Sequence, residues 1–241
     1  MTYRVNSAED IIPWLKSEQA RFERNWKQTL NALPAESLAF FDCSHKVWFT
    51  CLSTLQSQRT ITSEMAFLIW DELDVAFKQA MDSSYFSCVR SLRFVFEFSL
   101  QAAILEDNYA GLLETQTKLN KAWEDNDFKT FKRPMIDRLK NTGAITETEW
   151  EKASEMYTEL SQSGGHPVGS FIRRFYEDHS VSLGLHLFDH DFFLLCSEFC
   201  RKVIDLFLVV LFNKYPQLTS NNNLKNLVTD LGLSIALSHM A

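Results

Sequence analysis

The sequence has few residues that break regular structure. Its 241 residues include only 7 glycines and 5 prolines, which is below the usual proportion of both residue types. A chain with so few turn-forming residues is a poor match for a turn-dense β-sandwich. We therefore expect long helices joined by few connections.

Long apolar runs and a disulfide framework are absent as well. The longest apolar run, 203–212, is interrupted by Asp205 and has about half of the roughly 20 residues that a membrane span requires. The 5 cysteines are an odd number, and no targeting leader precedes them. We therefore expect a cytoplasmic protein with reduced thiols and no membrane partner.

Positive charge is also scarce, since the formal net charge is −7. An acidic surface disfavours broad attraction to nucleic acid or anionic lipid, so RNA or nucleotide binding requires a confined basic site. Hydrophobic residues, in contrast, make up 46% of the chain and include 20 phenylalanines and 6 tryptophans. They suffice for a large core without metals or disulfides. We expect one domain over residues 1–241, with a boundary near 82–84 as the alternative.

Apolar residues recur every three or four positions through most of the chain, which predicts α-helices. The expected fold class is all-α, a helical bundle. The segment 84–106 is apolar almost all round, as is typical of a helix in the middle of a bundle. Thr146 and Glu149 have capping-box spacing and predict a helix start. Helices are expected at 11–33, 34–55, 62–81, 84–106, 109–124, 127–141, 146–161, 189–215 and 223–239.

The polar residues of the apolar segment 84–106 form one narrow stripe. Arg90, Arg93 and Glu97 follow one another at helical steps of three and four residues, which places them on one side of the helix. The stripe is either part of a binding site for an anionic ligand or an ordinary ion pair between Arg93 and Glu97. Both interpretations predict that the loss of Glu97 is costly.

The helical pattern breaks between residues 164 and 184, where glycine, proline, arginine and histidine gather. Arg174 and His179 fit the spacing Arg-x4-His. Such a pair suits RNA cleavage without a metal ion, because histidine can transfer a proton while arginine stabilises the charge on the phosphorane. The spacing also arises by chance in a chain of this composition, so a purely structural role is the alternative.

Two further pairs have the spacing of metal ligands on a helix. His186 and His190 lie at i, i+4 and either face one metal ion or cap the start of a helix. Cys196 and Cys200 share this spacing, but no second cysteine pair matches them, so buried thiols are expected. We predict no metal site and no cofactor, with a helical metalloprotein as a third alternative.

A larger pattern joins several of these residues. The motif Arg-x3-Glu at Arg93 and Glu97 is followed by Tyr-x2-Leu-Ser at Tyr157 and Ser161, by His166-Pro, and by a long apolar helix. Over residues 82–215 this pattern resembles a set of uncharacterised prokaryotic all-α proteins, which are similar to the higher eukaryotes and prokaryotes nucleotide-binding (HEPN) superfamily. The resemblance implies a four-helix up-and-down core, a homodimer, and a role in defence or stress through RNA or nucleotide binding.

The resemblance also implies roles for individual residues. In HEPN proteins that keep Arg-x4-6-His, the motif cleaves RNA, so His179 is the expected general acid or base and Arg174 the expected phosphate stabiliser. Tyr157, Ser161 and His166 are expected to fix the loop that carries them. A second hypothesis needs no catalysis: the apolar helices mediate dimerisation or bind a protein partner, and the histidine-rich loop is structural. The sequence leaves open whether the protein is an enzyme.

Overall fold

The structure, a computed structural model, is built of α-helices. It describes residues 12–33, 35–55, 61–107, 117, 121, 124, 134–141, 143, 145–162 and 188–240. None of these residues is in a strand. The chain is therefore all-α, as its composition and periodicity predict.

The helix boundaries agree closely with the periodicity of the sequence. The predicted ends of the first four helices lie within a few residues of the observed ones, because the apolar pattern and the turn residues between them are local signals. The helices are α1 (Ile12–Ala32), α2 (Ala35–Leu55), α3 (Ile61–Met81), α4 (Tyr85–Asp107), α6 (Pro134–Asn141), α7 (Glu147–Leu160), α9 (His190–Lys214), α10 (Asn222–Asp230) and α11 (Ser234–Ser238), with a 3₁₀ helix η4 (Pro216–Ser220).

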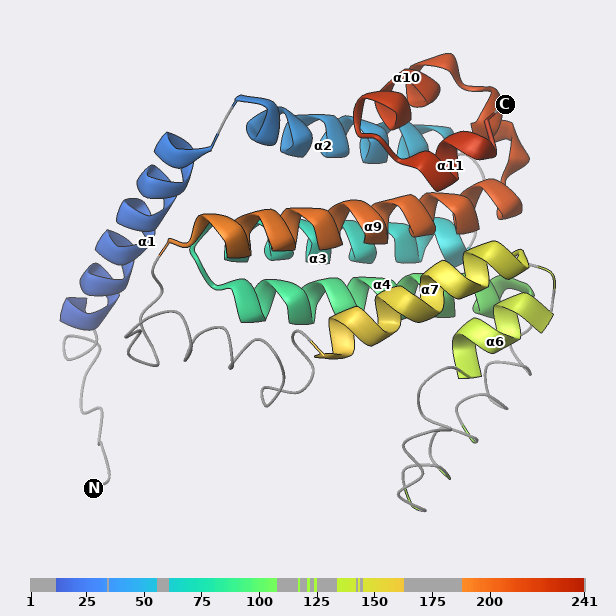
Figure 1. Cartoon of the computed structure of the whole chain (residues 1–241), viewed down its shortest axis with the longest axis horizontal. Coiled ribbons are helices and arrows are strands. Elements are labelled where there is room, and N and C mark those ends of the chain that lie inside the picture. The colour runs from blue at the N-terminus through green and yellow to red at the C-terminus, as the bar shows by residue number, and fades with distance from the viewer. Residues whose placement is uncertain are drawn as a thin grey trace.

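α4 lies at the centre of the arrangement. It runs beside α3 and α9, and α6 and α7 cover another part of its surface (Figure 1). α2 packs on α3 and on α10, and α11 packs on α9. The central position of α4 matches its nearly uniform apolar sequence. The finer expectation of a four-helix up-and-down core stays a prediction.

The core is continuous between the ends of the bundle. Its buried side chains come from every helix except α1, and α9 contributes an unbroken buried run from Val203 to Phe212. This run is the longest apolar segment of the sequence, and here it packs against other helices. Within the described ranges, no helix combines the length and hydropathy that a bilayer crossing demands.

The predicted helix 223–239 is wrong, because the structure ends α10 at Asp230 and begins α11 at Ser234. Gly232 between them has a φ of +65°, a left-handed conformation that costs glycine little. Its N–H donates to Thr229 O at 3.0 Å, and the N–H of Leu233 donates to Val228 O at 3.0 Å. This pair of bonds is a Schellman motif, which ends a helix.

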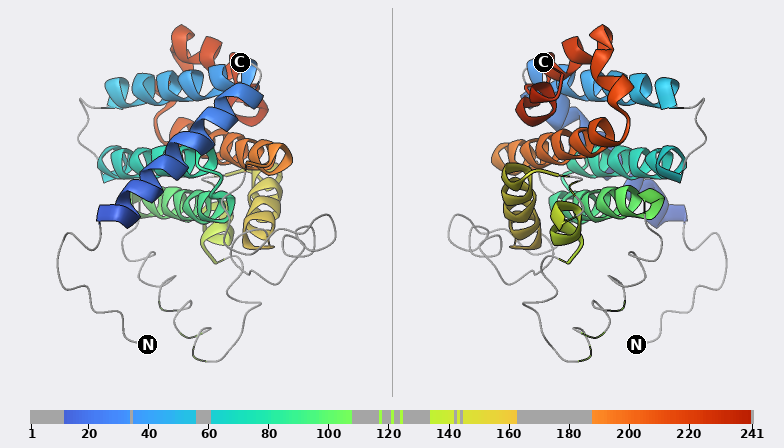
Figure 2. Two further views of the ribbon diagram at one scale, coloured as in Figure 1. Left: turned by 90° about the vertical axis from the view of Figure 1, so that its left-hand side faces the viewer. Right: turned by 90° about the vertical axis from the view of Figure 1, so that its right-hand side faces the viewer.

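The turn at residues 82–84 ends α3 in the same way without a glycine. Ser83 has a φ of +63°, and the N–H of Ser84 donates to Gln79 O at 2.8 Å. α1 attaches to the bundle at this turn and leans away from the other helices in Figure 1, and the left view of Figure 2 shows it crossing in front of their ends. The expected single domain, and the alternative boundary at 82–84, stay predictions.

Candidate functional site

The packing of α4 against α7 brings together two residue pairs that the sequence singles out. Arg93 and Glu97 lie one turn apart on α4, and Tyr157 and Ser161 lie one turn apart at the end of α7. Arg93 Nε donates to Glu97 Oε1 at 2.9 Å, and Arg93 Nη2 donates to Tyr157 Oη at 3.4 Å. Residues that are 64 positions apart in the sequence thus form one polar cluster.

Hydrogen bonds at the N-terminus of α7 fix the helix that carries Tyr157 and Ser161. Thr146 Oγ1 accepts from the N–H of Glu149 at 3.4 Å, and Glu149 Oε2 accepts from the N–H of Thr146 at 2.7 Å. This is the predicted capping box. The other carboxylate oxygen of Glu149, a buried residue, bonds to His239 near the end of the chain. The helix is therefore fixed at its first turn.

The buried side of α7 determines where Tyr157 and Ser161 lie. Ala153, Met156 and Leu160 pack into the core, so Tyr157 and Ser161 lie at the edge between core and solvent. The ring of Tyr157 lies 6.4 Å from that of Phe96, between ring centroids. Tyr157 therefore has an apolar side against α4 and a hydroxyl that meets Arg93.

The electrostatics of the cluster keep Arg93 cationic. Burial by itself lowers the pKa of Arg93, but the hydrogen bond to Glu97 and the charge of that carboxylate outweigh burial and raise it. Burial raises the pKa of Tyr157 above its usual value, and the nearby Arg93 charge only partly opposes this. At neutral pH the cluster thus presents a guanidinium and a neutral phenol, which both donate hydrogen bonds to oxyanions.

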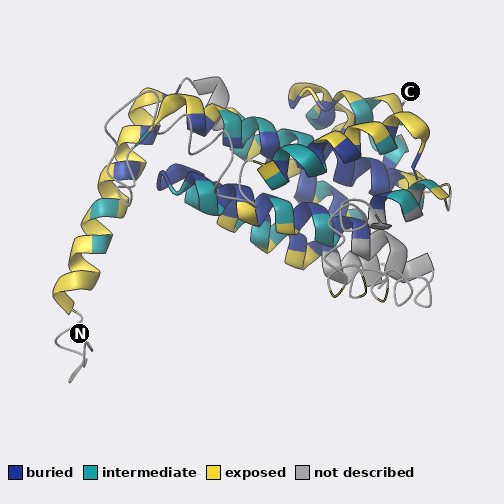
Figure 3. Ribbon diagram, turned by 60° about the horizontal axis from the view of Figure 1, so that its bottom comes forward, coloured by how far each residue is buried: buried dark blue, intermediate teal, exposed yellow. Residues whose placement is uncertain are grey.

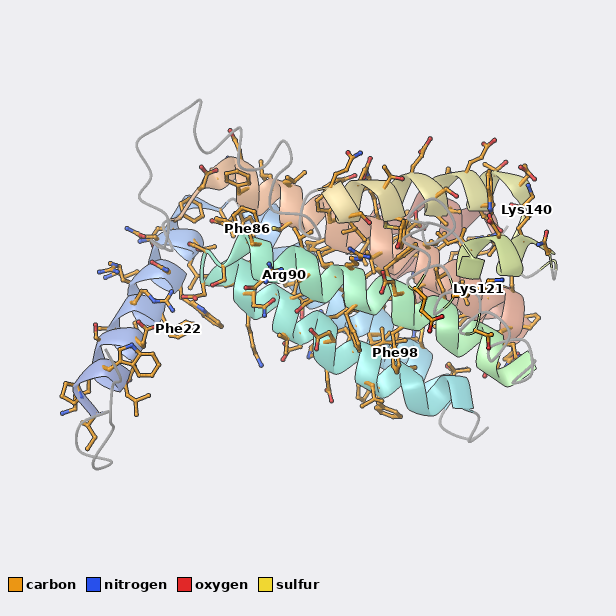
Figure 4. All side chains as sticks on the ribbon, turned by 90° about the horizontal axis from the view of Figure 1, so that it is seen from below. Phe22, Phe86, Arg90, Phe98, Lys121 and Lys140 are labelled. Carbon is orange, nitrogen blue, oxygen red and sulfur yellow. The ribbon has the colours of Figure 1, made fainter. Side chains whose placement is uncertain are left out.

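A second row of side chains on α4 lies beside the cluster. Arg90, Phe94 and Phe98 follow at steps of four residues, and Arg90 and Phe98 lie on the same side of α4 in Figure 4. The rings of Phe94 and Phe98 are stacked, with centroids 5.3 Å apart and an interplanar angle of 17°. Phe94 is 50% exposed, which is unusual for a large aromatic side chain.

This aromatic row was missed by the sequence analysis. The segment 84–106 is so apolar that its narrow polar stripe does not show how far the exposed side extends around the helix. The available signal was the i, i+4 spacing of Phe94 and Phe98 from the exposed Arg90. Arginine and exposed aromatic residues in one row are the types that bind single-stranded nucleic acid.

Other predicted residues lie outside the part of the chain that the structure describes. These are His166, Arg174, His179 and His186. The expected catalytic roles of Arg174 and His179 therefore stay predictions. In the sequence, the first of these residues, His166, follows Ser161 by five positions.

The predicted thiols are found as expected, and a third joins them. Cys196 and Cys200 on α9 are buried and reduced, and so is Cys88 on α4. The hydrogen bond from Cys88 and burial together raise the pKa of Cys196 well above its usual value, so this thiol is protonated and inert.

Of the predicted pair His186 and His190, the structure describes only His190. His190 Nδ1 lies 3.7 Å from Asp191 Oδ1 at the exposed start of α9. Among the residues with described positions, no group of three or more histidine, cysteine, aspartate or glutamate side chains is arranged to hold a metal ion. The candidate site is therefore the α4–α7 surface formed by Arg90, Arg93, Phe94, Glu97, Phe98, Tyr157 and Ser161.

Comparison with known proteins assigns no relative. The chain matches no protein-family model, no curated protein and no solved structure.

Proposed function

We propose that the protein binds single-stranded RNA on this α4–α7 surface, which we call the RNA face, as a HEPN-like protein of defence or stress. One observation carries this proposal: the exposed Phe94, stacked on the partly buried Phe98, lies in one row with Arg90 and beside Arg93. The row offers rings for bases, and the arginines offer positive charge for phosphates. Together they form the confined basic site that an acidic protein needs to bind RNA.

Stacking supplies the part of the affinity that does not depend on charge. The exposed ring of Phe94 can take a base on its open face, and such contacts contribute about 1–3 kcal/mol per base. Arg93 supplies charge from a fixed position, because Glu97 and Tyr157 hold its guanidinium. A guanidinium has five N–H donors, and these two bonds use two of them. A phosphate oxygen would bond to the remaining ones.

Cleavage is the stronger form of the proposal. His179 would exchange a proton with the 2′-hydroxyl or the leaving oxygen, and Arg174 would stabilise the charge on the phosphorane. His166 would help to fix this segment beside Tyr157 and Ser161. In a homodimer two such segments would form one composite cleft. No metal ion takes part in this scheme.

Binding is tested by fluorescence anisotropy with a labelled, mixed-sequence single-stranded RNA in EDTA. Phe94→Ala is expected to weaken binding by about 5- to 150-fold, which corresponds to the loss of one stacking contact. Arg93→Gln is expected to weaken binding and to lower its salt dependence. The matched control is Arg201→Gln, which removes an arginine from a similar ion pair with Glu198 on α9 and should leave binding unchanged.

Three results would count against the RNA face. They are no binding by the unmodified protein, unchanged binding by Phe94→Ala, and equal losses in Arg93→Gln and Arg201→Gln. Cleavage is followed on gels with the same RNA. His179→Ala and Arg174→Ala are expected to abolish cleavage and retain binding. Binding without cleavage by the unmodified protein would reduce the proposal to RNA binding.

A protein-interaction module is the second candidate function. It is favoured by the large apolar side chains that α1, α2 and α3 expose to solvent. Monomeric proteins seldom expose contiguous apolar surface of this kind. This function requires neither the RNA face nor Arg174 and His179, and a partner with an apolar helix or groove would suit it.

A further inference from the structure

α1 buries its polar side and exposes its apolar side. Its buried residues are Asn25 and Thr29, and most of its length is exposed in Figure 3. Asn25 Nδ2 donates to Asp82 O at 2.9 Å, and Thr29 Oγ1 donates to Met81 O at 3.0 Å. A surface helix normally does the reverse. The large exposed apolar residues of α1 are Ile12, Trp14, Leu15, Phe22, Trp26 and Leu30.

Most of these apolar residues share one side of α1. Ile12, Leu15, Phe22, Trp26 and Leu30 are spaced by combinations of three and four residues, which places them in a continuous stripe along the helix. We call these five residues the arm stripe. Such spacing is typical of a helix that packs into an apolar groove.

α2 and α3 form such a groove. A cavity of about 570 Å³ between them is lined by aromatic residues that include Trp48, Phe49, Phe67 and Trp70. A second cavity of about 360 Å³ continues it, because Asp42, His45 and Trp70 line both. The groove is therefore longer than a pocket for one small molecule.

The rim of this α2–α3 groove is apolar and solvent-exposed. Phe49 is 75% exposed, and Phe67 on the opposite side is exposed as well. The stack of His45 on Trp70, with ring centroids 4.4 Å apart, forms part of the lining. Trp26 of the arm stripe borders the second cavity, whereas the N-terminal half of α1 points away from α2 (Figure 1). α1 thus reaches one end of its own groove at Trp26, but it contributes no residue to the first cavity and leaves that cavity open.

α1 and the two helices of the groove carry opposite net charges, although the groove lining itself is balanced because Asp42 and Asp74 pair with Lys46 and Lys78. α1 contains four basic and two acidic residues, and α2 and α3 together contain six acidic and two basic residues. A basic helix is attracted at long range to an acidic pair of helices, which favours their encounter. A second copy of the chain supplies both surfaces at once, because a two-fold axis repeats each contact.

We propose that two copies of this chain form a dimer in which the arm stripe of each copy docks in the α2–α3 groove of the other. Aromatic side chains bury roughly 150–250 Å² each. The half-exposed residues of the arm stripe and of the groove rim thus provide several hundred square ångströms per copy, and both contacts together reach the order of a standard interface. The RNA face takes no part in this contact.

The test is sedimentation velocity on the full chain. The arm variant is Leu15→Glu/Phe22→Glu, and the groove variant is Phe49→Glu/Phe67→Glu. Ser17→Glu/Gln28→Glu is the matched control, since it adds the same charge to exposed positions of α1 outside the arm stripe. We expect the unmodified protein and the control to sediment with twice the chain mass of 28.0 kDa. We expect the arm and groove variants, checked for helicity by circular dichroism, to sediment as monomers.

Mixing the two variants separates this arrangement from others. The arm variant keeps an intact groove and the groove variant keeps an intact arm, so their mixture is expected to regain a dimer through one of the two contacts. A monomeric unmodified protein would overturn the proposal and favour a foreign partner. A groove variant that stays dimeric, or a mixture that stays monomeric, would overturn the pairing of arm with groove. The RNA-binding measurement on Phe94→Ala tests the RNA face separately, so a failure of the dimer proposal leaves that result unchanged.

Discussion

Removal of the Asp82 carboxylate is expected to release α1 from the bundle. This side chain is only 4% exposed and lies at the turn between α3 and α4. Arg21 Nη1 donates to its two oxygens at 3.2 and 3.0 Å, and Ser84 Oγ donates to Oδ2 at 3.1 Å. Besides Asn25 and Thr29, this ion pair is the main attachment of α1 that the structure describes.

The size of the effect follows from these contacts. Loss of one partner of a buried ion pair costs about 3–5 kcal/mol. Arg21 is 18% exposed and keeps its bond to Glu18, so we expect a smaller cost, about 2–3 kcal/mol, for Asp82→Ala. Since α1 has few other contacts with the bundle, the cost should fall on local opening of α1 and only weakly on global unfolding.

Amide hydrogen exchange followed by mass spectrometry measures this directly. A cost of about 2–3 kcal/mol corresponds to roughly 30- to 150-fold faster exchange in α1, with α4 and α9 little changed. Glu147→Ala is the matched control, because it breaks an exposed ion pair with Lys140 between α7 and α6 and should leave α1 unaffected. Unchanged exchange in α1 of Asp82→Ala, or equal acceleration in α4 and α9, would refute the reasoning.

Three further predictions concern stability and are checked by urea denaturation. Burial raises the pKa of Asp205, so the folded state holds this proton more tightly than the unfolded one. The difference in unfolding free energy between the unmodified protein and Asp205→Asn should therefore fall as pH rises from about 4, the ordinary carboxyl pKa, through the pKa of the folded state. A difference that does not change with pH would contradict the burial of Asp205. Ser83→Gly should stabilise the protein by about 0.5–1 kcal/mol, because Ser83 is left-handed, and Gly232→Ala should destabilise it by about 1 kcal/mol; opposite signs would refute this. Glu97→Ala should cost about 0.5–1 kcal/mol, since its pair with Arg93 is part-exposed, and a cost above 3 would indicate deeper burial.

Local signals account for the helices that the sequence predicted correctly. The capping box at Thr146 and Glu149 and the pair Arg93–Glu97 both depend on residues within one helical turn. The sequence alone therefore predicts both features. The break at Gly232 was missed because one glycine is tolerated inside a helix. α11 is held in part by a residue distant in the sequence, because Asp205 of α9 accepts hydrogen bonds from the N–H groups of Ile235 and Ala236 at 3.2 and 2.7 Å.

The site shows the same division. Periodicity placed Arg93 with Glu97 and Tyr157 with Ser161, yet only the packing of α4 on α7 joins the two pairs. For the nearly all-apolar α4, the spacing from Arg90 was only a weak signal that Phe94 faces solvent, because its exposure depends on which sides of α4 the neighbouring helices cover.

The sequence by itself determined that this protein is all-α, where most of its helices begin and end, and which polar pairs share a helix, because these properties depend on contacts within a few residues. Only the tertiary structure decided which apolar surfaces are covered. It turned Asn25 and Thr29 of α1 inward, since the peptide oxygens of Met81 and Asp82 accept hydrogen bonds there, and so left the arm stripe exposed. Whether a side of a helix is buried depends on how neighbouring helices pack on it, and the periodicity of that one helix does not predict this packing.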